Sequence, residues 1–345
     1  MITNIGVNTN FNYNKRGQSF RASASFVNKS VDAGFKKVDV NSADFIKYVY
    51  KKAKSMCYMP FEINVESGRI LDIAQSNEPH IFILNHTTKQ AKDINGALFF
   101  NSLLYREYIY QNKAESCPRS KILAGEGFLR RSKMADELKF MGVMPIDAKA
   151  HDKGSKDKNR ASIQDIVEKL ASGKINFFIF PEGAMAMIPF LPLKYKFQAG
   201  VSSIIKKVLE KRDNIKVVPL AFAHNKQGSS IHIGEPIKFS KKDNEYYVSK
   251  GNVESKFFDK KLKNFYGEKD EILLTNHGQA VGSNEVVPFI SGVLSENLGC
   301  CIKEAKSDIK HSGGKVFLIW KLVRKYLHWL GNYNTILPFF LIKIM

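Results

Sequence analysis

The chain has 345 residues, 44% of them apolar, which is enough to bury the core of one large domain with appendages or of two domains. Its formal net charge of +20 implies an anionic partner: a membrane surface, nucleic acid, or a substrate that carries phosphate or coenzyme A. The four cysteines show neither metal-ligand spacing nor a disulfide framework, which favours a reducing, cytosol-facing location. Residues 1–37 lack the apolar segment of a signal peptide, and no run of about 18 apolar residues predicts a membrane-spanning helix.

The first part of the chain has three predicted pieces. Residues 1–40 lack a sustained apolar period and are predicted to form a disordered leader. Residues 44–57 place apolar side chains at helical spacing beside lysines, which predicts an amphipathic helix that packs on the domain or lies on anionic lipid. The alternating residues 61–65, a turn, and residues 69–73 predict a β-hairpin.

A histidine follows the next predicted strand. The apolar run 81–84 delivers Asn85 and His86 to a polar loop that ends at Asp93. Catalytic side chains gather at the carboxyl ends of strands in open α/β sheets, and histidine is the usual general base near neutral pH. Asp93 is the candidate partner that orients the imidazole. The alternative is that His86 is an ordinary loop residue and that Asp93 only caps the predicted helix 94–110.

A second loop of interest follows the predicted strand 121–124. It reads Gly-Glu-Gly-Phe-Leu-Arg-Arg over residues 125–131. Such a turn can hold a phosphate, because guanidinium groups bind phosphate oxygens in pairs. The alternative is a surface turn whose charges are solvated.

Strands and helices alternate in the middle of the chain. The predicted order is a helix at 134–140, a strand at 143–146, a charged loop at 151–160, a helix at 162–171 closed by Gly173, a strand at 176–180, a helix at 201–211 and a strand at 217–222, with residues 230–239 closing the region. This order favours an α/β fold with a mixed, largely parallel central sheet flanked by helices. The strand 176–180 ends in Phe-Pro-Glu-Gly, which sets Glu182 at a second strand end.

These blocks, in this order and spacing, resemble the glycerolipid acyltransferase family, whose best-known members are the lysophosphatidate acyltransferases. In the first family block, Asn-His is followed after four residues by Asp; the histidine is the general base and the aspartate orients it. Asn85 and His86 match this block, whereas Asp93 comes two residues late and Ala91 occupies the expected position.

The second family block, Gly-x-x-Phe-x-x-Arg, is matched by Gly125, Phe128 and Arg131. The family uses this arginine around the phosphate of the acceptor. Arg131 is therefore implied as the phosphate ligand.

The third family block, Phe-Pro-Glu-Gly-Thr-Arg, is matched up to Gly183, while Ala184 and Met185 replace its last two residues. One phosphate contact is thereby lost. Lys194, Lys196 or Arg130 could replace it, or the acceptor is not a lysophosphatidate. Further matches are Phe197 and Gly200 with Gln198 at a lysine position, then Val218-Pro219 and Gly234-Glu235-Pro236, so that the resemblance spans residues 79–239.

The resemblance implies transfer of an acyl group from a thioester, acyl-CoA or acyl-carrier protein, to a hydroxyl of a lysophospholipid or glycerol phosphate in phospholipid biosynthesis. No cofactor beyond the donor and no metal are implied. The implied catalytic residues are His86 and Asp93, and the implied substrate-binding residues are Asn85, Gly125, Phe128, Arg131, Glu182, Gly183, Lys194 and Lys196. A catalytically inactive membrane-binding protein of the same fold would explain Ala91, Ala184 and Met185. A nucleic-acid binder would explain the charge but not the order of the blocks.

The predicted domains are the leader, an acyltransferase domain over residues 41–250, an appended lobe of unknown role over 251–310, and an amphipathic segment over 311–345. Within the lobe, residues 286–301 are predicted to be helical. Residues 316–330 form a basic amphipathic pattern, and the apolar residues 336–345 are too few to span a bilayer. The alternatives for this segment are packing on the domain and interfacial membrane binding. The expected location is the cytoplasmic side of a membrane, in peripheral or monotopic association.

Overall fold

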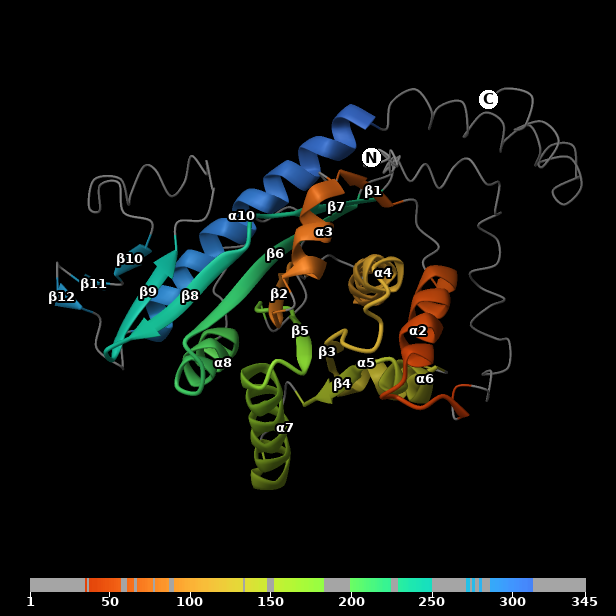
Figure 1. Ribbon diagram of the computed structural model, residues 1–345, viewed down its shortest axis with the longest axis horizontal. Coiled ribbons are helices and arrows are strands. Elements are labelled where there is room, and N and C mark those ends of the chain that lie inside the picture. Colours follow the sequence, from red (N-terminus) through yellow and green to blue (C-terminus); the bar gives the residue numbers. More distant parts are fainter. Residues whose placement is uncertain are drawn as a thin grey trace, which may run out of the picture.

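The computed structural model describes residues 35, 37–56, 61–64, 67–76, 78–86, 90–132, 134–147, 152–182, 199–224, 229–249, 271–273, 275–276, 279–280 and 286–312 (Figure 1). Its centre is a ten-stranded mixed sheet with helices on both faces. Five neighbouring strands of this sheet are parallel and run in the order β6-β2-β5-β3-β4. They are β2 (His80–Leu84), β3 (Arg119–Gly125), β4 (Val143–Ile146), β5 (Ile175–Ile179) and β6 (Asn214–His224). The predicted α/β class is confirmed.

Two apolar cores lie on opposite faces of the sheet, because successive side chains of a strand point to opposite sides. On β2, Phe82 and Leu84 join one core while Ile81 and Ile83 join the other. The first core lies under α2 (Ala43–Met56), α3 (Ser67–Gln75), α4 (Gln90–Tyr110), α5 (Glu126–Arg131) and α6 (Ala135–Phe140). The second lies under α7 (Lys153–Ala171), α8 (Ala199–Leu209) and α10 (Val286–Ser312).

On the side away from β2, β6 pairs with two antiparallel strands. Its first residues pair with β8 (Ile237–Lys242) and its last with β7 (Ser229–Ile233). Pro219 lies between these pairings, where Gly234 N–H donates to its carbonyl oxygen at 2.8 Å. Because proline has no N–H, it is tolerated where the ladder changes partner. The antiparallel side continues through β9 (Glu245–Ser249) and β10 (Glu271–Leu273), β1 (Phe61–Asn64) pairs in parallel with β7, and β11 (Thr275–Asn276) pairs with β12 (Gln279–Ala280).

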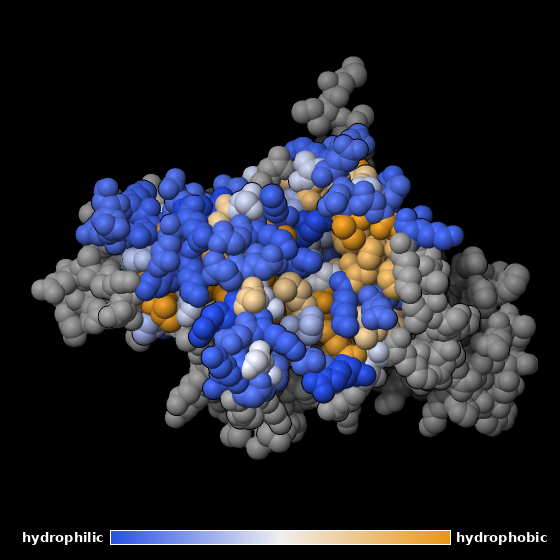
Figure 2. Space-filling view, turned by 90° about the horizontal axis from the view of Figure 1, so that it is seen from below, coloured by the Kyte–Doolittle hydropathy of each residue, from blue (hydrophilic) through white to orange (hydrophobic). Residues whose placement is uncertain are grey.

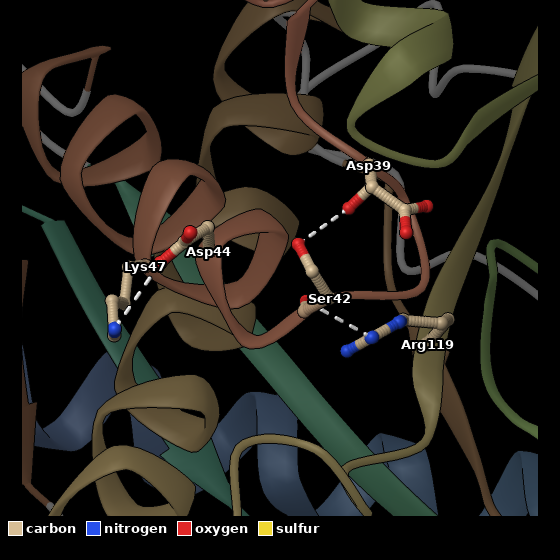
Figure 3. A network of polar contacts seen from close by, with 5 residues as sticks. All are labelled: Asp39, Ser42, Asp44, Lys47 and Arg119. Atoms are coloured by element: carbon tan, nitrogen blue, oxygen red, sulfur yellow. Dashed lines mark hydrogen bonds and ion pairs between the residues drawn. The ribbon is translucent and has the colours of Figure 1, made fainter.

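Helix α2 confirms the predicted amphipathic helix, and its apolar face packs on the domain. Phe45, Ile46, Val49 and Ala53 are buried in the first core, against α4. The segment before α2 is held as well, as Figure 3 shows. Arg119, at the start of β3, donates to the Ser42 carbonyl oxygen at 3.1 Å.

Three expectations about local structure are wrong. Residues 69–73 lie in the helix α3 and not in a strand, with Ile70, Ile73 and Ala74 buried on one face. The predicted charged loop 151–160 is mostly the first half of α7, which Asp152 caps by accepting a hydrogen bond from Ser155 N–H at 2.7 Å. Helix α4 begins at Gln90 and not at residue 94.

Helix α10 extends the predicted helix 286–301 and runs along β6 and β7 (Figure 1). Val286, Ile290, Leu294 and Leu298 are buried in the second core, so this helix, which falls within the predicted appended lobe, packs on the main sheet. By length and composition alone, the helical segment Val286–Ser307 is also long and apolar enough to cross a membrane. A long core helix meets the same criterion.

The surface seen in Figure 2 is mostly hydrophilic, with smaller apolar patches between the hydrophilic residues. The predicted leader up to residue 34 and the basic amphipathic segment 316–330 lie outside the described residues. Phe35, close to the end of that leader, is buried and packs on the Phe140 ring with centroids 5.2 Å apart.

Candidate active site

The sequence blocks meet at the carboxyl edge of the parallel strands. Strand pairing fixes their relative positions, because Ile83 is opposite Ile179 and Ile122 is opposite Phe178. Just beyond the ends of β2 and β5, His86 lies beside Glu182 and bonds to its carboxylate. Two blocks that are 96 residues apart in sequence are thus adjacent in space.

His86 is held at its backbone and at its ring. Its backbone N–H donates to Glu182 Oε1 at 2.9 Å. Its imidazole stacks on the Phe180 ring, with centroids 4.5 Å apart and planes at 14°. Phe180 and Glu182 are 7% and 8% exposed, so both supports are themselves fixed by burial, while the histidine is only partly buried. This leaves the imidazole oriented and still accessible.

Asn85 is buried and bonds to the neighbouring strand. Its amide Nδ2 donates to the Phe222 carbonyl oxygen at 2.9 Å, and its Oδ1 accepts from Phe222 N–H at 2.6 Å. These two bonds tie the end of β2 to β6 immediately before the histidine. The structure gives Asn85 a positioning role, and its contact with substrate stays a prediction.

The glycine block ends β3 and opens α5. Gly125 is the N-cap of α5 with φ −61°, so this position does not require glycine for its dihedral angle. Phe128 packs partly buried against the first core, and exposed Arg130 pairs with Glu126 at 3.1 Å. Arg131 is the last residue of α5. Its backbone is described, whereas its side chain is not.

Asp93 lies in the first turn of α4. Since the helix begins at Gln90, Asp93 is not its N-cap, and that alternative reading is wrong. The side chain of Asp93 lies outside the described residues, so its contact with His86 stays a prediction. The same holds for Gly183, Lys194 and Lys196, which fall in the undescribed stretch 183–198.

The later blocks have structural roles here. Arg69 of α3 donates to the Ile233 carbonyl oxygen and pairs with Glu235. A Cβ atom on Gly234 would lie 2.5 Å from Cys301 Sγ and 3.2 Å from Pro219, so glycine is needed where α10 crosses β6. These contacts join α3, β6 and α10 near the edge that carries the histidine.

The arrangement provides an accessible imidazole, held between Glu182 and Phe180, at the end of a buried strand. Such a group can take a proton from a hydroxyl and return it to a leaving group. Among the described residues, no cluster of three or more His, Cys, Asp and Glu side chains could hold a metal ion.

A comparison with known protein families gives a match. Residues 66–223 match the family model described as Acyltransferase. These residues form an acyltransferase domain. The family includes glycerolipid acyltransferases such as the lysophosphatidate acyltransferases, so the resemblance seen in the sequence blocks is confirmed. A comparison with curated proteins gives no match.

The acyltransferase domain extends from just before α3 almost to the end of β6. Helix α2, the antiparallel strands and α10 lie outside the match, although these strands belong to the same sheet, α10 packs on β6 and α2 packs on α4. The sequence did not single out Phe180 or Phe222 as site residues. Phe180 belongs to a recognised block, but no sequence pattern signals that its ring stacks on His86.

Proposed function

We propose that the acyltransferase domain transfers an acyl group from acyl-CoA or acyl-carrier protein to a hydroxyl of a lysophospholipid or glycerol phosphate, in phospholipid biosynthesis. The observation that carries this proposal is the juxtaposition of His86 with Glu182 and Phe180 at one sheet edge. A hydroxyl acceptor needs a general base, and His86 is a partly accessible, oriented base at that edge.

In the proposed reaction, His86 accepts the proton of the hydroxyl while the hydroxyl oxygen bonds to the thioester carbonyl carbon. The tetrahedral oxyanion then collapses and the carbon–sulfur bond breaks, with its electron pair leaving on sulfur. Protonated His86 returns the proton to this thiolate. Asp93 would hold the productive tautomer of the imidazole and stabilise its protonated form. No acyl-enzyme intermediate is required.

The acceptor class rests on Arg131. A guanidinium binds phosphate oxygens in pairs, and α5 begins at the carboxyl edge of β3, beside the strand that carries Glu182. Lys194 and Lys196 are candidates for a second phosphate contact. The charge of +20 is consistent with an anionic membrane surface as the place where a lipid acceptor is met.

The test is His86→Ala in the full-length chain. We assay release of the thiol from acyl-CoA and from acyl-carrier protein, with a panel of lysolipids and glycerol 3-phosphate as acceptors. The variant should lose roughly 10²- to 10⁴-fold in kcat, the usual contribution of a general base. Lys153→Ala is the control: this side chain is exposed in the first turn of α7, on the other face of the sheet, and should retain full activity.

Unchanged turnover in His86→Ala, at an unchanged melting temperature, would overturn the mechanism. Absence of transfer by the unmodified chain with every donor and acceptor would instead favour a catalytically inactive membrane-binding protein. Ala91, Ala184 and Met185 motivate that second candidate, because they replace family residues.

A further inference from the structure

Helix α2 precedes the acyltransferase match and reaches across to α6. Glu137 of α6 has a fully buried side chain, whose Oε1 lies 2.7 Å from Lys52 Nζ. The Tyr48 hydroxyl donates to the same oxygen. Two side chains of α2 therefore converge on one buried carboxylate oxygen of α6.

An aromatic cluster strengthens this junction. The Phe140 ring, at the end of α6, packs on Phe45 and Tyr48 of α2, with centroids 5.3 Å and 5.6 Å apart. Both contacts are edge-on, the geometry that aromatic pairs favour. The charged contact lies one helical turn before the aromatic one, so α6 is held along most of its length.

A short turn joins α6 to the helix that carries Arg131. Ser132 N–H donates to the Leu129 carbonyl oxygen at 3.0 Å, and Ala135 N–H donates to the Ser132 carbonyl oxygen at 3.1 Å. The Ser132 hydroxyl accepts from Met134 N–H at 3.2 Å. Only residues 132–134 separate the two helices, so a shift of α6 displaces the end of α5.

A buried ion pair is a poor way to gain stability, because desolvation of the charges offsets most of their attraction. Apolar side chains of similar volume would hold α2 against α6 as strongly. The ion pair instead restricts the two helices to one relative position, since Glu137 meets Lys52 and Tyr48 in only one alignment of α2 and α6. The junction is thus suited to fixing a position.

We propose that α2 is a positioning element of the acceptor site, and that Tyr48, Lys52 and Glu137 act through α6 to fix where α5 presents Arg131. This inference rests on the proposed function for the role of Arg131, but the junction itself does not. None of the three is a catalytic residue, because each acts through the α5–α6 turn.

The kinetic test compares Glu137→Gln and Tyr48→Phe with the unmodified chain. Misplacement of a binding group by about 1 Å can cost up to roughly 100-fold, and we expect about tenfold higher acceptor KM for a partial shift. The donor KM and kcat at saturating acceptor should stay within about twofold, since the junction lies on α2 and α6 and not on the strand end that carries His86. If Glu137→Gln folds poorly, Tyr48→Phe tests the same junction by removing only the hydroxyl that donates to Glu137.

The link to Arg131 is tested by a double-mutant cycle. In an Arg131→Ala background, Glu137→Gln should raise the acceptor KM no further, because the group it positions is gone. Val208→Ala is the matched control: it removes a buried side chain on the other face of the sheet and should lower the melting temperature without changing acceptor KM. Additive effects in the cycle, or an equal rise in KM for Val208→Ala, would overturn the proposal.

Hydrogen exchange separates this inference from the proposed function. Glu137→Gln should speed amide exchange in residues 126–140 and leave α7 unchanged, whether or not the chain transfers acyl groups. If exchange rises over these residues but no acyl donor is consumed, α2 does position α5 and the proposed function fails. If the enzyme is active and exchange over residues 126–131 is unchanged, the positioning role of α2 is refuted and the acyltransferase proposal stands.

Discussion

His86 owes its position to three residues from two other strands. Glu182 and Phe180 follow β5, and Phe222 lies in β6. Glu182 was expected to shape the acceptor pocket, and the structure shows its carboxylate bonded to the histidine backbone. A role in the pocket stays a prediction beside this positioning role.

Asp93 is the first residue to test. It precedes Gly96 by three positions and Ala97 by four, so these positions share the face of α4 that packs on β6. We therefore expect a carboxylate oxygen of Asp93 within hydrogen-bond distance of a ring nitrogen of His86. Asp93→Asn should lower kcat steeply with little change in melting temperature, because the amide keeps the size and loses the charge that favours the imidazolium.

Asp136→Asn is the control for Asp93→Asn. Asp136 lies in the first turn of α6 and is exposed, so its substitution should leave kcat unchanged. Full activity in Asp93→Asn, with a separation from His86 beyond hydrogen-bond reach, would mean that the histidine works without this partner.

At the level of elements, the parallel strands were predicted because their signal is local. β2 and β5 are short, fully buried and mostly apolar runs, and the chain order alone places their ends at one edge of the sheet, so His86 and Glu182 were expected at the same edge. The first half of α7 was missed because it is polar all round and carries no apolar period. Its cap, Asp152 with Ser155, was the available signal.

Helix α3 was missed for a different reason. Its short apolar run after a predicted turn was interpreted as the return strand of a hairpin, although Ile70, Ile73 and Ala74 have helical spacing. The pairing of β1 with β7 depends on contacts across more than 160 residues, which no local pattern encodes. Ring stacking at the site is likewise a tertiary property.

The packing of α4 on the sheet depends on Gly96. A Cβ atom there would lie 3.0 Å from the Phe222 ring, and Phe222 is itself 1% exposed. Gly96→Ala should lower the free energy of unfolding by up to about 2 kcal/mol, because an overpacking cost of about 1 to 3 kcal/mol exceeds the gain of about 1 kcal/mol in helix propensity. Urea denaturation measures this difference.

Gly292→Ala in α10 gives the opposite sign. Nothing lies within 4 Å of the added Cβ, so only the helix propensity remains and stability should rise. A stabilising Gly96→Ala would show that α4 can move away from β6 at little cost.

His80, at the start of β2, makes the fold sensitive to acid. Burial, together with Lys216, lowers the pKa of His80 from 6.5 to about 4. Between these values only the unfolded chain takes up the proton, so the free energy of unfolding falls as the pH drops from 6.5 to 4. At pH 5 the loss should be about 2 kcal/mol, at 1.36 kcal/mol per unit of pKa.

Urea denaturation at pH 7.5 and 5.0 checks this effect. His80→Gln, which cannot titrate, should lose about 2 kcal/mol less than the unmodified chain over that interval. Equal losses in the two proteins would assign the acid sensitivity to other groups.

For the whole molecule, the charge is unevenly distributed along the chain. Residues 313–345 contain five lysines and arginines and no acidic residue. We expect the full-length chain to bind vesicles that contain anionic lipid, with weaker binding at high salt. Replacement of Lys321, Arg324 and Lys325 by glutamine should weaken vesicle binding by about 100-fold, at about 1 kcal/mol for each basic side chain.

The control removes three charges from another surface. Lys153, Lys156 and Lys158 are exposed on α7, and their replacement by glutamine should change vesicle binding by less than about threefold if the site is local. Cosedimentation measures both variants. Equal losses would indicate that the net charge acts as a whole and that the segment 316–330 has no special part in binding.

The place of β2 between β5 and β6 has a consequence during synthesis. The strand leaves the ribosome first, but the bonds that hold its end join residues 96 and 137 positions apart. Until β5 emerges, a fully apolar run of four residues, Ile81 to Leu84, lacks both neighbouring strands, and until β6 emerges it still lacks one of them, which exposes it to aggregation. Proteolysis of ribosome-bound chains truncated before and after β6 measures this order. We expect β2 to be protected from proteolysis only in the longer chains. The nascent polypeptide would therefore depend on chaperones for longest at the strand that leads into His86.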